Sequence, residues 1–324
     1  MRNSYARGFA VVAAGLGAVA TLTACGTSKT DSGALTVVAS TNVWGSVAQA
    51  VAGPDIKVES LISDPTADPH SYEVTAVQAA QISDAALIVY NGGGYDEFID
   101  KAISGKNKRN VNAVEIAEEG EHATGEAGPS QAPVSNGSGG GNEHGHSHDH
   151  DGANEHVWYD AHVAAHVAEH IAESLGELDP ANRQAYADRA AAFGTQLAGV
   201  EAITAKIAAE HPNQPVLQTE PLAYYLLLAA KADDRTPKSF QESVEQGTDP
   251  SPADVAAVRD LLKAKQVRAL VYNIQTEDST TKDMRATAQA NGIAIVEVTE
   301  TLPQGLDYIR WMTGNAEALA AALA

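Results

Sequence analysis

Short apolar runs alternate with helical patterns along most of the chain. In its first half, four β-rich runs bounded by turn residues predict strands, and they lie at 35–41, 56–62, 86–92 and 111–116. In its second half, three further runs of this kind lie at 215–220, 268–274 and 293–300. Stretches with helical periodicity separate these runs, and alternating strands and helices are typical of a parallel sheet. We therefore predict an α/β fold.

A long amphipathic pattern separates the two series of strands. Asp179 is placed to cap a helix that has Pro180 at its first position. Beyond them, apolar residues recur at steps of three and four and form one continuous face: Tyr186, Ala190, Phe193, Leu197, Val200, Ile203 and Ile207. A helix of about 30 residues is about 45 Å long, which spans more than one lobe. The pattern predicts two lobes, each with a parallel-rich β-sheet flanked by helices, joined by one long rigid α-helix.

These patterns set the expected domain boundaries. The N-terminal α/β lobe covers residues 35–177, the linking helix covers 178–211, and the C-terminal α/β lobe covers 212–324. Within the first lobe, residues 117–154 are rich in Gly, Ser, Glu and His and contain few apolar side chains. A segment of this composition cannot bury a core, so we predict a disordered loop there.

The start of the chain has the pattern of an export signal. Two arginines precede an apolar run at 9–20, and small residues then precede Cys25, the only cysteine. This arrangement is similar to a bacterial lipobox, in which the cysteine becomes the acylated first residue. We predict a signal peptide over residues 1–24, lipidation at Cys25, and a tether over residues 25–34. The protein would then be exported and anchored to the outer face of the cell membrane.

The charge balance limits the class of partner. The full chain has a formal net charge of −21, and removing residues 1–24 takes away two arginines and no acid, which gives −23. Nucleic acids and anionic lipid surfaces repel so acidic a protein. The charge instead suits a protein that binds cations, and no nucleic-acid partner is expected.

Four side chains of the kind that bind metal ions lie where ligands bind in open parallel sheets, beyond the carboxyl ends of strands. His70 follows the run at 56–62, and His156 follows the predicted loop. Glu220 and Glu300 each end a predicted strand. A histidine after Asp-Pro can simply cap a turn, and a glutamate at a strand end is often solvated. Together, however, two imidazoles and two carboxylates can neutralise and enclose a divalent cation.

Several segments resemble a known family. DPHSYEVTAVQAAQISDAALIVYNGGGYDEFID and NEHVWYD resemble the two main signatures of the zinc/manganese (TroA-like, cluster A-I) solute-binding proteins of ABC transporters. TEPLAYYLLLAA and VEVTETLPQGLDYIRWM resemble the segments that carry that family's third and fourth ligands. The resemblance implies metal ligation by His70, His156, Glu220 and Glu300. It also implies two α/β lobes with a long linking helix.

The same resemblance implies capture and delivery rather than catalysis. A protein of this family hands its metal to a membrane permease driven by a cytoplasmic ATPase. We therefore expect a monomer that is not an enzyme. Because one rigid helix joins the lobes, we expect metal release by a local opening around one ligand loop. Two positions depart from the family pattern, since zinc members commonly have His where Glu220 stands and most members have Asp where Glu300 stands.

The identity of the metal follows from opposing arguments. The oxygen donors of Glu220 and Glu300 suit manganese, whereas the Irving–Williams order favours zinc at a site of imidazoles and carboxylates. The predicted loop carries four further histidines, which suit zinc and would form an auxiliary low-affinity site: His144, His146, His148 and His150. We predict zinc as the cargo, with manganese or iron as the alternative.

A rival motif lies in HVAEH, residues 166–170, which matches the His-x-x-Glu-His pattern of inverted zinc proteases. In that interpretation His166 and His170 bind zinc, Glu169 acts as base, and Glu242 or Glu245 supplies a third ligand. The alternative interpretation is an exposed stripe of imidazoles on a helix, which also includes His162. An adhesin-like role, which predicts a host partner and no metal dependence, has no direct support in the sequence.

Overall fold

The computed structural model describes residues 35–64, 67, 69–70, 72–124 and 154–324, with the side chains of 121–124 left out. All of these residues fall within one compact unit, 34–324. The predicted signal peptide, the tether with Cys25 and the four loop histidines (His144, His146, His148 and His150) lie outside the described residues. Within the described residues, no helix is both long enough and apolar enough to cross a membrane.

The first sheet is fully parallel, with strand order β2-β1-β3-β4. Its strands are β1 (Thr36–Thr41), β2 (Lys57–Ile62), β3 (Leu87–Tyr90) and β4 (Asn110–Asn112). Side chains alternate between its faces: Val37 packs with helix α1 (Asn42–Ala52), whereas Val38 packs with α2 (Ala76–Asp84) and α3 (Glu97–Ile103). Helices on both faces explain why the strands read as continuous apolar runs.

The second sheet repeats this arrangement, with strand order β6-β5-β7-β8 and parallel pairing throughout. Its strands are β5 (Pro215–Gln218), β6 (Asp233–Asp234), β7 (Ala269–Asn273) and β8 (Ala294–Val298). Its helices are α7 (Tyr224–Ala229), α8 (Lys238–Glu245), α9 (Pro252–Lys263), α10 (Ser279–Ala290) and α11 (Tyr308–Leu323). In both sheets the second strand lies at one edge and the first beside it. The predicted fold class, two parallel sheets flanked by helices, is confirmed.

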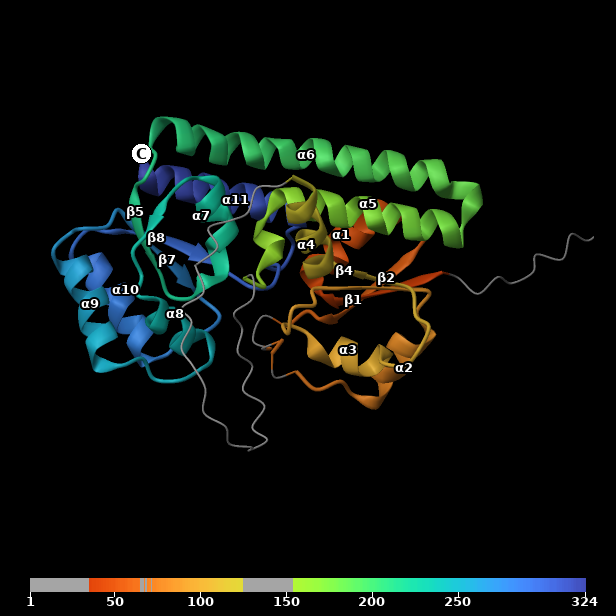
Figure 1. Cartoon of the computed structure of the whole chain (residues 1–324), viewed down its shortest axis with the longest axis horizontal. Coiled ribbons are helices and arrows are strands. Elements are labelled where there is room, and N and C mark those ends of the chain that lie inside the picture. The colour runs from red at the N-terminus through yellow and green to blue at the C-terminus, as the bar shows by residue number, and fades with distance from the viewer. Residues whose placement is uncertain (1–34, 65–66, 68, 71, 125–153) are drawn as a thin grey trace, which may run out of the picture. The chain divides into compact units, whose positions relative to one another are not determined.

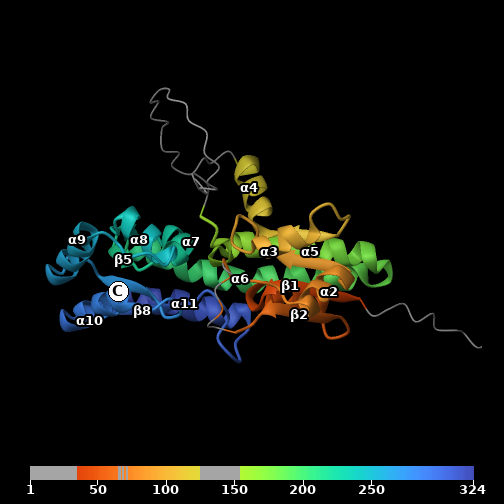
Figure 2. The ribbon, with the colours of Figure 1, turned by 90° about the horizontal axis from the view of Figure 1, so that it is seen from below.

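Two long helices connect the sheets. Helix α5 (Ala161–Leu178) is followed by its C-cap Asp179 and by a 3₁₀ turn η2 (Pro180–Asn182). Helix α6 (Arg183–Glu210) then runs beside α5 and α11 (Figure 1, Figure 2). Most of the apolar face predicted for α6 is buried: Tyr186, Ala190, Phe193, Leu197, Val200 and Ile207. These side chains belong to one buried cluster that also includes Val37 of the first sheet and Val216 of the second.

The structure differs from the sequence prediction between β4 and the predicted loop. The strand expected at 111–116 ends at Asn112, and helix α4 (Ala113–Thr124) takes up the residues that follow. The side-chain oxygen of Asn112 accepts hydrogen bonds from the backbone of Val114 and Glu115, at 3.1 and 3.3 Å. Asn112 therefore caps the new helix. The prediction of a loop from residue 117 was wrong as far as Thr124.

Candidate metal-binding site

The carboxyl edge of the second sheet brings two of the predicted ligands together. Glu220 follows β5 and Glu300 follows β8, while Asn273 is the last residue of the strand between them, β7. The Asn273 amide donates to Glu220 Oε2 at 2.6 Å and to Glu300 Oε1 at 3.1 Å. Glu220 is 4% exposed and also accepts a hydrogen bond from the Thr276 hydroxyl. One amide thus holds both carboxylates at the end of the sheet.

Tyr95, which follows β3, connects the two predicted histidines with Glu300. Its ring is buried and meets the His70 ring edge-on at 5.0 Å and the His156 ring at 6.2 Å between centroids. Its hydroxyl donates to Glu300 Oε2 at 3.3 Å. Through Tyr95 and Asn273, the structure brings all four residues singled out from the sequence into one neighbourhood.

His156 is the most firmly held of the four. It lies just before the 3₁₀ turn η1 (Val157–Tyr159), is 3% exposed, and packs edge-on against Trp158. Its Nδ1 atom lies 2.9 Å from the side-chain oxygen of Asn154, which can only accept a hydrogen bond. The ring proton therefore sits on Nδ1, and Nε2 keeps its lone pair for a cation.

Asn154 is itself fixed to the C-terminal lobe. Its amide donates to the Pro221 carbonyl at 2.8 Å, and its own carbonyl accepts from the Tyr225 hydroxyl at 2.6 Å. Pro221, the residue next to Glu220, therefore helps to hold Asn154, and Asn154 in turn orients His156. His70 is held less tightly, since 35% of its side chain is exposed; its Nε2 atom lies 3.2 Å from a carboxylate oxygen of Glu155.

Two further acidic residues lie at this site, and the strand-end pattern does not single them out. Glu155, His156 and Glu245 each offer an atom within 4.8 Å of the others, and Glu245 Oε1 lies 3.6 Å from His156 Nε2. Glu155 stands next to His156 in the signature and could have been included on that ground. Glu245 ends α8, and only the fold brings it here. The rival interpretation, in which Glu242 or Glu245 serves the His166 motif, gains no support from Glu245, because this residue lies beside His156.

The carboxyl groups of the site hold their protons more tightly than usual. Burial raises the pKa of Glu155 to about 8, and the charges of Glu245 and Glu300 add to the rise. Burial likewise raises the pKa of Glu220 and of Glu245 to about 7 each. Burial lowers the pKa of His156 to about 3, so this imidazole is neutral at physiological pH. A divalent cation among these groups would offset the repulsion and meet an unprotonated ligand.

The rival motif does not assemble a protease site. His166 Nε2 faces His162 Nε2 at 3.2 Å, one turn earlier on α5, and His166 Nδ1 lies 3.2 Å from Glu169. Its ring therefore pairs with His162 rather than with His170. The side chains of His166 and Glu169 are 43% and 63% exposed. The arrangement matches the exposed stripe of imidazoles.

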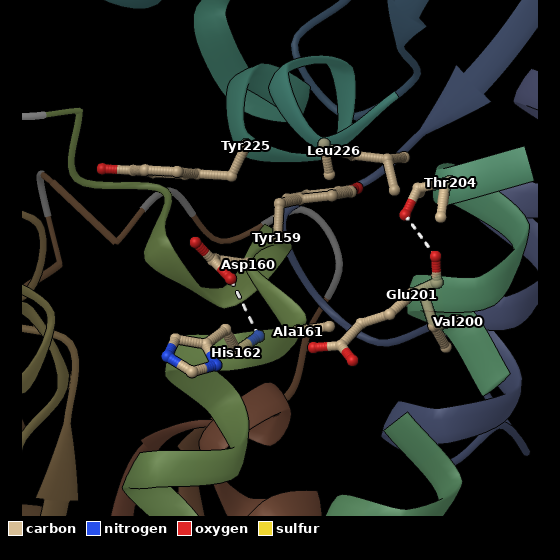
Figure 3. Close-up of a pocket in the computed structure, with 11 residues that line it drawn as sticks. Tyr159, Asp160, Ala161, His162, Val200, Glu201, Thr204, Tyr225 and Leu226 are labelled. Carbon is tan, nitrogen blue, oxygen red and sulfur yellow. Dashed lines mark hydrogen bonds between the residues drawn. The ribbon is translucent and has the colours of Figure 1, made fainter. Parts of the chain in front are cut away.

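A pocket of about 210 Å³ lies apart from the predicted ligands, between the start of α5, α6 and α7 (Figure 3). Its lining is mainly apolar, and it includes two carboxylates and one imidazole, those of Asp160, Glu201 and His162. None of His70, His156, Glu220 and Glu300 lines it. This pocket is therefore distinct from the candidate metal site.

Comparisons with known proteins agree with this architecture. The profile of the family described as zinc-uptake complex component A, periplasmic, matches residues 37–322. The manganese-binding lipoprotein MntA of Halalkalibacterium halodurans is 25% identical over 321 residues, which cover 97% of this chain and 95% of MntA.

Two solved structures share the fold. The periplasmic zinc-binding protein TroA of Treponema pallidum has a TM-score of 0.69 at 19% identity, with 90% of this chain and 100% of TroA covered. FpvC of Pseudomonas aeruginosa, solved in complex with Ni²⁺, has a TM-score of 0.64 at 20% identity, with 90% of this chain and 97% of FpvC covered. At these identities the likeness establishes the fold alone.

Proposed function

Because the chain belongs to the family of periplasmic zinc-uptake complex component A proteins, we propose that it captures zinc outside the cytoplasm and delivers it to an ABC permease for import. That it is a metal-binding substrate-binding protein of an ABC transporter follows from its family and from its relative MntA. In this proposal the protein is a monomer anchored by a lipid on Cys25. It works with a membrane permease and its cytoplasmic ATPase.

The proposed ligands are His70, His156, Glu220 and Glu300. The observation that supports the proposal is that two side chains link these four residues. Tyr95 contacts three of them, and Asn273 donates hydrogen bonds to both carboxylates. Each ligand thus has a neighbour that orients it, which is how metal ligands are held in proteins. The ligands also come from both lobes, so in this proposal the cation lies in the cleft between the lobes.

Glu155 and Glu245 have a supporting role in this proposal. Glu245 faces the free nitrogen of His156, and Glu155 faces Nε2 of His70. In the absence of cation, each carboxyl group gives its histidine a partner. When the cation binds, it takes the place of these contacts, and the negative charge of both glutamates stabilises it nearby.

Release of the cation would begin at His70. Helix α6 packs in one buried cluster with residues of both sheets, which opposes a large change in the angle between the lobes. His156 is buried, and both its backbone N–H and its ring Nδ1 are hydrogen-bonded to the Asn154 side chain. His70 is partly exposed and lies in the connection between β2 and α2. A movement of that connection removes one ligand and leaves the other three in place.

Two considerations bear on the choice of cation. The Irving–Williams order favours zinc for a mixed imidazole and carboxylate site, and the loop histidines would supply further zinc ligands. The carboxylates around the site suit manganese, which the name of MntA also carries. We propose zinc as the cargo, and manganese as the second candidate because Glu155 and Glu245 bring the nearby carboxylates to four.

A direct experiment separates these candidates. The full chain is produced in medium with equal zinc and manganese, and the metal retained after purification is measured. We expect about one tightly held zinc per chain, loss of that zinc in His156→Ala, and no loss in the control His170→Ala. Retention and import of manganese instead of zinc would overturn the zinc assignment. Retention of zinc by His156→Ala would overturn the proposed site.

Catalysis is not part of the proposal. The motif that would support a peptidase directs His166 toward His162 rather than toward a metal shared with His170. Glu245, which that mechanism would need as a third ligand, contacts His156 instead. Incubation of the zinc-loaded protein with unfolded protein substrates tests this point, since specific peptide cleavage abolished by His166→Ala would contradict it.

A further inference from the structure

The first turns of α5 carry two imidazoles that face each other. The Nε2 atoms of His162 and His166 are 3.2 Å apart, and the rings lie edge to face with 4.5 Å between centroids. On the other side of His166, Nδ1 lies 3.2 Å from a carboxylate oxygen of Glu169. All three side chains lie on the solvent side of the helix, away from the buried Val163 and Val167.

This spacing fits two ligands of one cation. A Zn–N bond is about 2.0–2.1 Å long, so two nitrogens at neighbouring corners of a tetrahedron are about 3.3 Å apart. In a square or octahedral shell with bonds of this length, they are about 2.9 Å apart. The 3.2 Å observed between His162 and His166 lies between these values. A cation therefore needs only small rotations of the two rings, because residues four apart on a helix already share a face.

Glu169 prepares His166 for this role. A carboxylate only accepts hydrogen bonds, so the contact with Glu169 places the ring proton of His166 on Nδ1 and leaves a lone pair on Nε2. Metal-binding histidines in proteins commonly have a carboxylate on the opposite nitrogen in this way. In the absence of a cation, Nε2 of His162 donates its proton to that lone pair. When a cation binds, the proton of His162 moves from Nε2 to Nδ1, and Nε2 of His162 becomes the second ligand.

The charges around the pair also favour a cation. Asp160 caps α5 by accepting from the His162 backbone at 2.8 Å, and its carboxylate lines the same pocket as the His162 side chain and Glu201 of α6 (Figure 3). Asp160 and Glu169 thus add two acidic side chains beside the two imidazoles. Arg or Lys side chains are absent from the lining of this pocket in the described part of the chain.

We propose that His162 and His166 form a second metal site, outside the cleft, for cations that prefer imidazole, such as Cu²⁺, Ni²⁺ and Zn²⁺. Only two protein ligands contribute, so water completes the shell and the cation exchanges readily. Mn²⁺, which prefers oxygen ligands, binds poorly there. The site begins six residues beyond His156 but shares no ligand with the cleft, and it is therefore independent of the proposed transport function.

Cu²⁺ is the probe that tests this site. The full chain is used with two changes that remove competing ligands: His156→Ala in the cleft, and serine in place of the four loop histidines. Cu²⁺ is titrated, and electron paramagnetic resonance reports how many nitrogens bind it. We expect a two-nitrogen signal, which His162→Gln or His166→Gln converts to a weaker one-nitrogen signal with about ten-fold or more loss of affinity, because the chelate is lost. The control His170→Gln, one turn further along, leaves the signal unchanged.

A second pair of variants tests the role of Glu169. Glu169→Gln removes the acceptor that fixes the His166 proton, and we expect up to about ten-fold weaker Cu²⁺ binding. Glu173→Gln, the same change one turn later on an exposed position, leaves binding unchanged. Equal effects of His162→Gln and His170→Gln, or no effect of either, would overturn the site and leave only a hydrogen bond between the two imidazoles. Because the cleft is disabled in this background, that outcome has no bearing on the proposed transport function.

Discussion

The Tyr95 hydroxyl of the N-terminal lobe donates a hydrogen bond to Glu300 of the C-terminal lobe, with 3.3 Å between the two oxygens. The ring of Tyr95 also contacts both His70 and His156. A single buried side chain therefore touches three of the four proposed ligands and both lobes. Its hydroxyl and its ring have separate tasks, which a conservative substitution can distinguish.

Tyr95→Phe keeps the ring and removes the hydroxyl. We expect about ten-fold weaker zinc binding, at the low end of the range for residues that support a ligand, because Glu300 loses the donor that orients it. A competition titration against a chelator of known affinity measures the change. The control is Tyr90→Phe. The Tyr90 hydroxyl donates to Asp100 on the face of the first sheet that packs with α2 and α3. Equal zinc affinities of the two variants would show that the Tyr95 hydroxyl does not position Glu300.

Asn273→Ala removes the donor shared by Glu220 and Glu300. Glu220, which is buried, and Glu300 then both lose their common donor, and we expect zinc affinity to fall by about 10- to 100-fold. The control Asn291→Ala alters an amide at the end of α10, which bonds to the backbone of its own helix. Calorimetric titration of both variants with zinc measures the difference. A normal affinity in Asn273→Ala would argue that the two glutamates do not act together.

Glu245→Gln tests whether the acidic residue at the end of α8 belongs to the site. The change keeps the shape of the side chain and removes its charge next to His156. We expect about ten-fold weaker cation binding, since an uncompensated charge in a partly buried site attracts a cation more strongly than a solvated one. Glu242→Gln on the same helix is the matched control, because Glu242 is more exposed and pairs with Lys238. If the two variants bind zinc equally well, Glu245 plays no part.

The stability of the cation-free protein should depend on pH through the buried carboxyl groups. The pKa of Glu220 is about 7 in the folded protein and 4.5 without burial, so folding favours its protonated form. The stabilisation is complete below about 4.5 and is lost as pH rises through about 7. The pKa of Glu245 and of Glu155 shifts in the same direction. We therefore expect the free energy of unfolding to rise as pH falls from 8 to 6.5.

Urea denaturation in the presence of a chelator measures this dependence. The window stops at pH 6.5 because His156 acts in the opposite direction below it. The pKa of His156 is about 3 when folded and 6.5 without burial, so the unfolded chain gains a proton that the folded chain refuses. Glu220→Gln should make the profile between pH 8 and 6.5 flatter. A wild-type profile that is level, or that falls toward pH 6.5, would contradict the prediction.

The strand pattern of the sequence predicts much of the candidate site. Glu220 and Glu300 were placed together because the carboxyl ends of parallel strands meet at one edge of a sheet, and β5, β7 and β8 do form that edge. The apolar face of α6 was also readable, since a long helix with a regular period has few alternative packings.

Other parts of the site depend on contacts that local sequence does not encode. Glu245 reaches His156 because Phe240 and Val244 on the buried side of α8 dock against the second sheet. Helix α4 was missed because its apolar content is low, and the signal that predicts it is a single capping residue, Asn112. The composition of the segment favours a loop, but the Asn112 cap and the good helix formers that follow it favour a helix, and the helix forms.

Each sheet packs one face against its own cluster of helices, α2 and α3 for the first sheet and α8, α9 and α10 for the second. The opposite faces of both sheets belong to one shared buried cluster. The buried cluster that contains the apolar face of α6 includes residues of both sheets, such as Val37 and Val216. A fragment that ended before α6, or began after it, would expose that face to water. We therefore expect the two lobes to unfold together as a single cooperative unit rather than as two modules. Capture of one ion in the cleft consequently protects the whole described polypeptide against unfolding and proteolysis, not only the loops that touch the ion.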